Sequence, residues 1–185
     1  SSLTLAEIQR FNAGISFSPG YQDEKVPTLK EVLECMPQSI FINIELKNLW
    51  TPFDELPIRT AAIIRDCNAQ KRVLISSYNY IGLRRYFAQI PTTPLGYLPR
   101  SPLEAYFLSK FPFLNKQFQS IHLSFKYLTP GLVTRFKMAG KKVFSYTLNH
   151  TQDILQAISM GIDGFFTDDP GLARRALIQN GFINS

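Results

Sequence analysis

The chain has 185 residues, of which 45% are hydrophobic and 18% are charged, and its formal net charge is +6. This length and composition are typical of one globular domain with a sizeable core. No apolar run approaches the roughly 20 residues of a membrane span, and no basic-then-apolar signal segment opens the chain. We therefore expect a cytoplasmic protein. Most of the scattered Lys and Arg residues are expected to form an ordinary solvated surface. The basic balance also suits an anionic ligand or a phospholipid surface as partner, and no nucleic-acid-binding motif is present.

The first 39 residues are predicted to be a helical lead-in to the rest of the domain. Thr4-Leu5-Ala6-Glu7 and Thr28-Leu29-Lys30-Glu31 both have the spacing of a capping box, in which a threonine and a glutamate three residues later begin a helix. The first helix is expected to end at Gly14 and the second at about Cys35. Residues 15–27 have the composition of a loop, with Pro19-Gly20 as a turn.

The stretch Phe41-Ile42-Asn43-Ile44-Glu45-Leu46-Lys47 is predicted to be a buried strand that becomes charged on one face as it ends. Successive side chains of a strand point to opposite faces, so Ile42, Ile44 and Leu46 share one face. Asn43, Glu45 and Lys47 share the other. A buried acid and amine at this spacing form either a structural ion pair or a binding site, because burying them alone is costly.

Helices and strands are predicted to alternate through the rest of the chain, from residue 40 to residue 185. Each expected helix begins at a capping residue or carries an apolar stripe at helical spacing, and each expected strand is a short apolar run. The strands are 40–47, 72–76, 93–98, 120–124, 142–147 and 164–167, and the helices are 56–69, 80–89, 103–108, 130–140, 151–160 and one that starts at Pro170.

This alternation predicts an α/β fold with a parallel sheet. A doubly wound sheet and a TIM (β/α)8 barrel both produce it, but no glycine-rich phosphate loop follows any strand, which disfavours the nucleotide-binding doubly wound form. The predicted carboxyl ends of the strands carry polar or aromatic residues, where a barrel places its chemistry. The prediction is therefore a TIM barrel that is incomplete here, with about six of its eight βα units.

Four stretches together resemble the glycerophosphodiester phosphodiesterase family. They are Ile44-Glu45-Leu46-Lys47, Val73-Leu74-Ile75-Ser76-Ser77-Tyr78-Asn79, Ser145-Tyr146-Thr147-Leu148-Asn149 and Gly161-Ile162-Asp163-Gly164-Phe165-Phe166-Thr167-Asp168-Asp169-Pro170. Each motif is weak alone, but their order matches the last six strands of that family's barrel. The lead-in stretch Val26-Pro27-Thr28-Leu29-Lys30-Glu31-Val32-Leu33 also matches the segment before the family's third strand.

The resemblance implies metal-assisted hydrolysis of glycerophosphodiesters to glycerol 3-phosphate and an alcohol. By this resemblance, Glu45 is a ligand of a divalent metal, Ca or Mg, and Lys47 contacts the phosphate. A hard cation prefers carboxylate oxygen and polarises a phosphoryl oxygen, while an ammonium holds another. Tyr146 stands on the wall that receives the alcohol, although packing explains it equally well, and Tyr78 has the same two interpretations. Asp168 is expected to serve the start of a helix rather than a metal.

The sequence departs from the family pattern at the catalytic residues. The family's two histidines, in a His-Arg and a His-Asp pair, and its Glu-x-Asp carboxylates belong to the first two strands, and no stretch here matches them. His122 is expected to be a strand residue with a structural hydrogen bond, and His150 an exposed loop residue. No catalytic residue is therefore identified in this chain.

Three interpretations remain open from the sequence. The chain is the carboxyl-terminal portion of an enzyme, an inactive barrel that binds phosphodiesters or a protein, or a lysophospholipase D-type enzyme acting at a membrane. The net charge of +6 and aromatic residues such as Trp50, Tyr106, Phe107, Phe111 and Phe113 give the third some support. The first predicts two further units before Ser1, and it predicts that residues 1–185 alone neither hydrolyse phosphodiesters nor close a barrel. The alcohol, the metal and the oligomeric state are not determined by the sequence.

Overall fold

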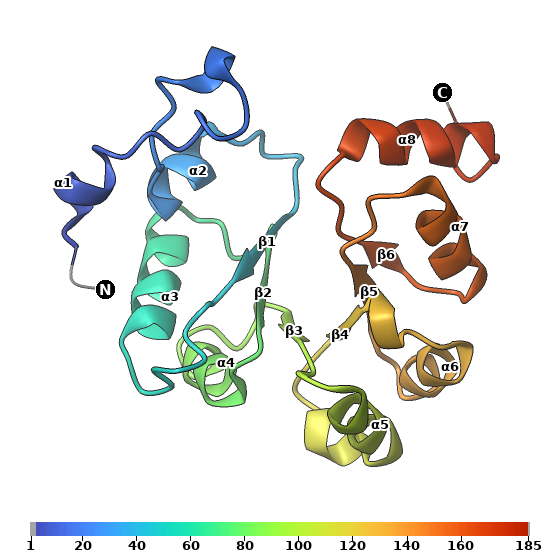
Figure 1. Ribbon diagram of the computed structural model, residues 1–185. Coiled ribbons are helices and arrows are strands. Elements are labelled where there is room, and N and C mark those ends of the chain that lie inside the picture. The colour runs from blue at the N-terminus through green and yellow to red at the C-terminus, as the bar shows by residue number, and fades with distance from the viewer. Residues whose placement is uncertain (1–2, 185) are drawn as a thin grey trace.

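The structure, a computed structural model, describes residues 3–184 and contains one sheet of six parallel strands. The strands are paired in chain order, and they curl around a common axis with the helices outside them (Figure 1). This is an open, half-barrel form of the predicted TIM barrel. The strands are β1 (Ile42–Glu45), β2 (Val73–Ser77), β3 (Leu95–Tyr97), β4 (Ser120–Ser124), β5 (Lys142–Tyr146) and β6 (Gly164–Phe165).

A helix follows each strand, as the alternating pattern predicted. The helices are α3 (Leu56–Asp66), α4 (Tyr80–Phe87), α5 (Pro102–Lys110), α6 (Pro130–Met138), α7 (Thr151–Ser159) and α8 (Pro170–Gln179). Two 3-10 turns that were not predicted, η2 (Pro112–Asn115) and η3 (Phe125–Tyr127), lie on either side of β4 in the sequence.

Local capping chemistry explains where these helices begin and end. The side chains of Thr129 and Asp169 accept hydrogen bonds from the backbone N–H groups of Leu132 and Leu172, and a proline follows each cap. Gly140 and Gly161 follow α6 and α7 with positive φ, a backbone conformation that favours glycine.

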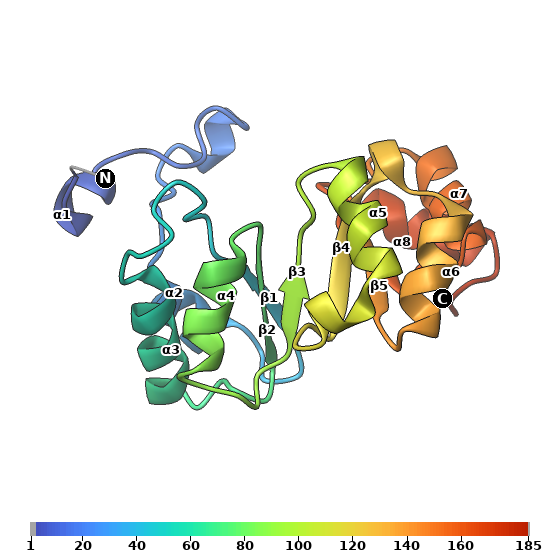
Figure 2. The same cartoon turned by 90° about the horizontal axis from the view of Figure 1, so that it is seen from below.

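The lead-in forms three short elements, of which the first two project beyond the ring of helices and the third packs against α3 (Figure 2). These are α1 (Leu5–Ile8), η1 (Pro19–Tyr21) and α2 (Leu29–Cys35), and both predicted capping boxes are present. The prediction that Gly14 ends the first helix is wrong, since α1 ends at Ile8. The guanidinium of Arg72, beside β2, donates to the carbonyls of Leu33, Met36 and Pro37 and so fastens the end of α2 to the sheet.

The main hydrophobic core lies between the outer face of the sheet and the helices. Alternate residues of the strands are fully buried there, which confirms the predicted placement of Leu46 with the apolar face. The members of this layer include Val73, Ile75, Leu95, Ile121, Leu123 and Val143. The opposite, inner face carries Glu45 and its register neighbour Ser76, so the curl of the sheet concentrates polar groups inside.

Two glycines let large side chains fill the inner face of the sheet. A Cβ on Gly96 would lie 2.5 Å from Nε2 of His122 and 2.9 Å from Oγ of Ser120. A Cβ on Gly164 would lie 2.7 Å from the ring of Phe144. Real Cβ atoms do not approach so closely, so these strands need glycine where the neighbouring strand contributes a ring.

Candidate functional site

The carboxyl end of β1 carries the residues singled out from the sequence. Asn43, Glu45 and Lys47 alternate with Ile42, Ile44 and Leu46, as predicted. The strand is less buried than expected, because β1 pairs only with β2: Glu45 is half-buried and Lys47 is exposed. Within residues 3–184, Glu45 and Lys47 form no ion pair, so the interpretation of a structural pair is wrong.

Two adjoining cavities at this end of the sheet share Glu45 and Tyr78. The inner cavity, about 140 Å³, is lined by Asn43, Glu45, Ser76, Tyr78, Leu98, His122, Tyr146, Thr147 and Phe166. The second, about 380 Å³, is lined by Glu45, Leu46, Lys47, Leu49, Trp50 and Tyr78. The structure thus brings Glu45, Lys47 and Tyr146 to the same end of the sheet, and the Glu45 carboxylate lines both cavities.

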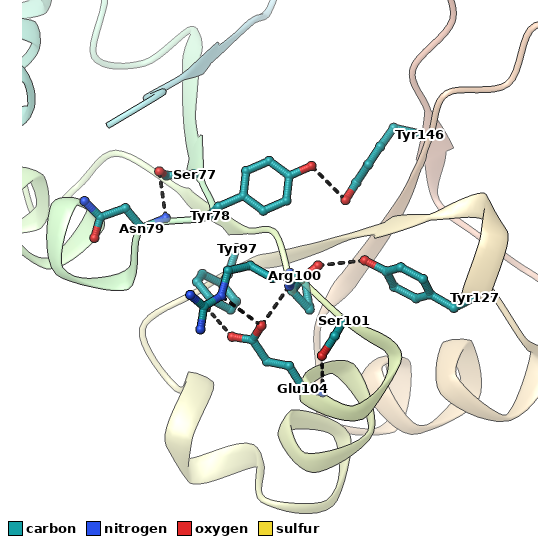
Figure 3. A network of polar contacts seen from close by, with 10 residues as sticks. Ser77, Tyr78, Asn79, Tyr97, Arg100, Ser101, Glu104, Tyr127 and Tyr146 are labelled. Atoms are coloured by element: carbon teal, nitrogen blue, oxygen red, sulfur yellow. Dashed lines mark hydrogen bonds and ion pairs between the residues drawn. The ribbon is translucent and has the colours of Figure 1, made fainter. Parts of the chain in front are cut away.

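A hydrogen-bonded pair of tyrosines lines the inner cavity together with Glu45; the pair is drawn in Figure 3. The Tyr78 hydroxyl donates to the Tyr146 hydroxyl oxygen at 3.0 Å, and the two rings meet edge to face. Burial, followed by hydrogen bonding with the hydroxyls of Tyr78 and Tyr127, raises the pKa of Tyr146 well above that of an ordinary tyrosine. Tyr146 is therefore a neutral hydroxyl at physiological pH, and the peptide bond that follows it is cis.

The loop after β3 is held by a second group of polar contacts (Figure 3). The buried Tyr97 hydroxyl donates to Glu104 at 2.5 Å, and the Arg100 backbone N–H donates to the same carboxylate at 2.8 Å. Tyr127 donates to the carbonyl of Pro99 at 2.6 Å. These bonds fix the segment that carries Leu98 into the inner cavity.

The loop that carries Lys47 is held from the neighbouring strand. The Ser77 hydroxyl donates to the Leu46 carbonyl at 2.6 Å, and the Asn79 side chain donates to the Asn48 carbonyl at 3.1 Å. The Asn48 amide in turn donates to Asp54 at 2.9 Å. Ser77 and Asn79 flank Tyr78 in the sequence, and their hydrogen bonds hold the backbone on either side of Lys47.

His122 lies in the floor of the inner cavity, on β4. It is 1% exposed, its Nε2 is 3.0 Å from Oγ of Ser120, and the rings of Phe144 and Phe166 pack against it. Burial lowers the pKa of His122 to about 4, so the imidazole is neutral at pH 7. This confirms a strand histidine with a structural hydrogen bond. His150 is exposed and lines neither cavity.

Asp168 follows β6 and lies outside both cavities. Its carboxylate accepts a hydrogen bond from Asn149 at 2.7 Å, and its backbone N–H donates to the same side chain at 2.9 Å. Asp169 caps α8, with Asp168 just before it. The contacts agree with a structural role at the start of this helix, and they join the loops after β5 and β6.

The ligand groups near Glu45 fit a hard cation only in part. In the described part of the chain, Glu45 is the one carboxylate that lines either cavity, and Asn43, with an amide oxygen in its side chain, lines the inner one. Residues 3–184 contain no cluster of three His, Cys, Asp or Glu side chains arranged to hold a metal. A cation that takes six or more oxygens would need further ligands from water, substrate or other protein groups.

The sequence interpretation did not assign Asn43, Ser76, Leu98 or Phe166 to the site, yet all four line the inner cavity. The alternation of side chains between the two faces of a strand could have identified Asn43 and Ser76. Asn43 is two residues before Glu45, and Ser76 is its register partner on β2. Leu98 and Phe166 fall inside the predicted strands 93–98 and 164–167, but β3 ends at Tyr97 and β6 at Phe165, so side-chain alternation along a strand does not place them.

Comparison with known proteins identifies the family. The model of the glycerophosphoryl diester phosphodiesterase family matches residues 1–172. A glycerophosphodiester phosphodiesterase of Caldanaerobacter subterraneus is 32% identical over 169 residues, which cover 90% of this chain and 68% of the relative. One of Bacillus altitudinis is 27% identical, over 92% of this chain and 70% of the relative.

Solved structures agree with the fold and with the sequence resemblance. A phosphodiesterase of Oleispira antarctica, solved in complex with the product sn-glycerol-3-phosphate, superposes with a TM-score of 0.84 at 27% identity, covering 94% of this chain and 70% of that protein. A protein from Silicibacter pomeroyi gives a TM-score of 0.78 at 25% identity, covering 97% and 69%. This chain belongs to the glycerophosphoryl diester phosphodiesterase family.

Proposed function

We propose that this chain carries part of the site that hydrolyses a glycerophosphodiester to glycerol 3-phosphate and an alcohol, with the help of a divalent metal. The observation that carries the proposal is the meeting of Glu45, Lys47, Tyr78 and Tyr146 around two adjoining cavities. The product bound to the Oleispira antarctica relative supports a small glycerophosphate compound as the ligand.

Each of these residues has a role that its chemistry supports. Glu45 would hold the metal, Ca or Mg, which when bound polarises a phosphoryl oxygen. The exposed ammonium of Lys47 opposes the negative charge that the phosphoryl group carries in the transition state. The paired hydroxyls of Tyr78 and Tyr146 donate to and accept from the oxygens of the alcohol part.

The acid–base step is not assigned to a side chain of this structure. His122 is the histidine that lines the inner cavity, and it is neutral, buried and hydrogen-bonded to Ser120. We therefore place the proton-transfer groups outside the described residues, in a longer chain. The alternative, a barrel that binds phosphodiesters without cleaving them, follows if the complete gene supplies no such groups.

The test is a turnover assay on the protein expressed from its complete gene. Glycerol 3-phosphate release is measured from a water-soluble glycerophosphodiester and from a lysophospholipid, with Ca²⁺ or Mg²⁺ and with chelator. We expect release that the chelator abolishes. Lys47→Met should lower kcat/KM by about a hundredfold, the usual cost of one electrostatic donor. Lys71→Met, an exposed lysine outside both cavities, is the matched control.

Two outcomes would reject parts of this proposal. Ligand binding without product release, under all metal conditions, would replace the enzyme by the binding barrel. Release only from the lysophospholipid would change the substrate class to a membrane lipid.

A further inference from the structure

The outward face of α5 has an unusual distribution of side chains. A surface helix ordinarily turns its large apolar residues inward, whereas α5 buries Ala105 and Ser109 and exposes Leu103, Tyr106 and Phe107. Leu103, Tyr106 and Phe107 share the i, i+3, i+4 spacing of one helix face. The small residues allow α5 to lie close to the molecule with Leu108 against the core, and Leu103, Tyr106 and Phe107 are exposed.

These side chains continue into η2 as one aromatic surface. Phe107 stacks on Phe111 with ring centroids 6.4 Å apart, and Phe111 meets Phe113 edge to face at 6.0 Å. Tyr106 meets Phe107 at 6.3 Å. The exposed fractions run from 43% for Phe111 to 71% for Phe113. We call the following set the α5 patch: Leu103, Tyr106, Phe107, Phe111, Phe113 and Leu114.

Cations border the α5 patch. The Lys110 ammonium lies 5.7 Å from the centre of the Tyr106 ring, and the Arg135 guanidinium, on α6, lies 5.3 Å from it. Lys116 follows η2 and is exposed. Among residues 3–184, none of these three cations forms an ion pair with a carboxylate.

The excess positive charge of the chain falls in the stretch of sequence that contains most of the α5 patch. Residues 105–152 contain seven of the 20 Lys and Arg residues and none of the 14 Asp and Glu residues. This stretch therefore carries a formal charge of +7, while 13 cations and 14 carboxylates leave the rest of the chain at −1. The cations are spread along the sequence, but carboxylates are absent from this stretch, which is about a quarter of the chain.

The α5 patch is remote from the edges of the sheet. It belongs to the connection between β3 and β4, the two central strands, whereas β1 and β6 are the edge strands (Figure 1). An element that paired with either edge strand would therefore meet the molecule at a different place.

We propose that the α5 patch docks this protein on an anionic phospholipid surface. Aromatic side chains concentrate at the boundary between headgroups and acyl chains, and neighbouring lysines and arginines are attracted to acidic lipids. A second copy of this chain fits the patch poorly, because a symmetric dimer would bring two such positive regions together. This proposal stands on the surface alone and does not depend on the reaction at Glu45.

The test is flotation with vesicles of phosphatidylcholine, with or without phosphatidylglycerol. We expect the protein to float with the vesicles that contain phosphatidylglycerol, and added salt should weaken this binding. Lys110→Glu and Lys116→Glu should each lower the partition coefficient about fivefold or more, the worth of one basic residue near such a surface. Phe107→Ser with Phe113→Ser should lower it at every salt concentration.

Matched controls and opposing outcomes complete the test. Arg174→Glu and Phe17→Ser change an exposed cation and an exposed aromatic residue outside the α5 patch and should leave binding unchanged. Circular dichroism checks that each variant is folded. Equal binding to both vesicle types, no binding, or binding that the patch variants do not change would overturn the proposal. Sedimentation that shows a dimer broken by the patch variants would assign the surface to a second copy instead.

Discussion

At the scale of single residues, Glu45 is the group on which the metal part of the proposed site depends. Among residues 3–184 it is the one carboxylate that lines either cavity, and it is half-buried next to Ser76. The position leaves its oxygens open to a ligand, because Lys47 does not occupy them.

Glu45→Gln should weaken Ca²⁺ or Mg²⁺ binding and leave the fold intact. The amide preserves the volume but removes the charge that a hard cation prefers. Loss of a direct ligand should exceed the roughly 10- to 100-fold that even outer partners contribute to metal affinity. Calorimetric titration of the complete protein measures the change. Glu55→Gln, on the exposed surface, is the matched control, and unchanged affinity in Glu45→Gln would remove Glu45 from the metal site.

His122 should make stability depend on pH. Its folded-state pKa of about 4 lies below the 6.5 of a free histidine, so the unfolded state binds more protons between these values. The contribution of the neutral His122 to the free energy of unfolding is fully present above about pH 6.5. It is lost as the pH falls towards 4, by roughly 3 kcal/mol in total.

Urea unfolding at a series of pH values between 7 and 4.5 measures this dependence. His122→Gln should reduce the difference between the two ends of the series, because the variant cannot take up the proton. His150→Gln, which changes an exposed side chain, is the control. An unchanged slope in His122→Gln would mean that other groups cause the acid sensitivity.

At the scale of elements, the inner face of the sheet depends on glycines placed opposite rings. Gly96 on β3 faces His122 and Ser120 on β4, both nearly fully buried, so neither can move aside easily. Gly131, on α6, has no such neighbour: a Cβ added there would have no atom within 4 Å.

Gly96→Ala should destabilise the protein by about 1–3 kcal/mol, the usual cost of overpacking a core. Gly131→Ala should be neutral or stabilising by up to about 1 kcal/mol, because alanine is the better helix former. Thermal and chemical denaturation of both variants gives the comparison. Equal stability of the two would show that β3 and β4 can separate to accept the methyl group.

At the scale of the whole molecule, the two edge strands differ from the rest of the sheet. β1 pairs with β2 alone and β6 with β5 alone, so each has one side without a partner strand among residues 3–184. Such edges are templates for pairing with another chain.

Within residues 3–184, no helix is long and apolar enough to cross a membrane.

Residues 1–185 expressed alone should therefore self-associate. Sedimentation velocity at increasing concentration should show growing species. Phe41→Lys, at a residue that precedes β1 and is 63% exposed, should reduce the association by placing a charge at the edge. Phe53→Lys, at an exposed residue outside β1, should not. A monomer at all concentrations would show that the edges are protected.

The sequence alone determined the kinds of element, their order and the face of β1 that carries Asn43, Glu45 and Lys47. Local physics decides these features: capping hydrogen bonds set the starts of α6 and α8, and strand alternation sets the side-chain parity. The resemblance of the motifs then identified the family, which the comparisons confirmed.

Only the tertiary structure decided which side chains meet. Tyr78 and Tyr146 are 68 residues apart in the sequence, and their hydrogen bond depends on the curl of the sheet between β2 and β5. The half-exposed setting of β1 and the outward aromatic face of α5 follow from how whole elements pack. Neither can be obtained from local pattern, because burial is a property of neighbours that lie far away in the chain.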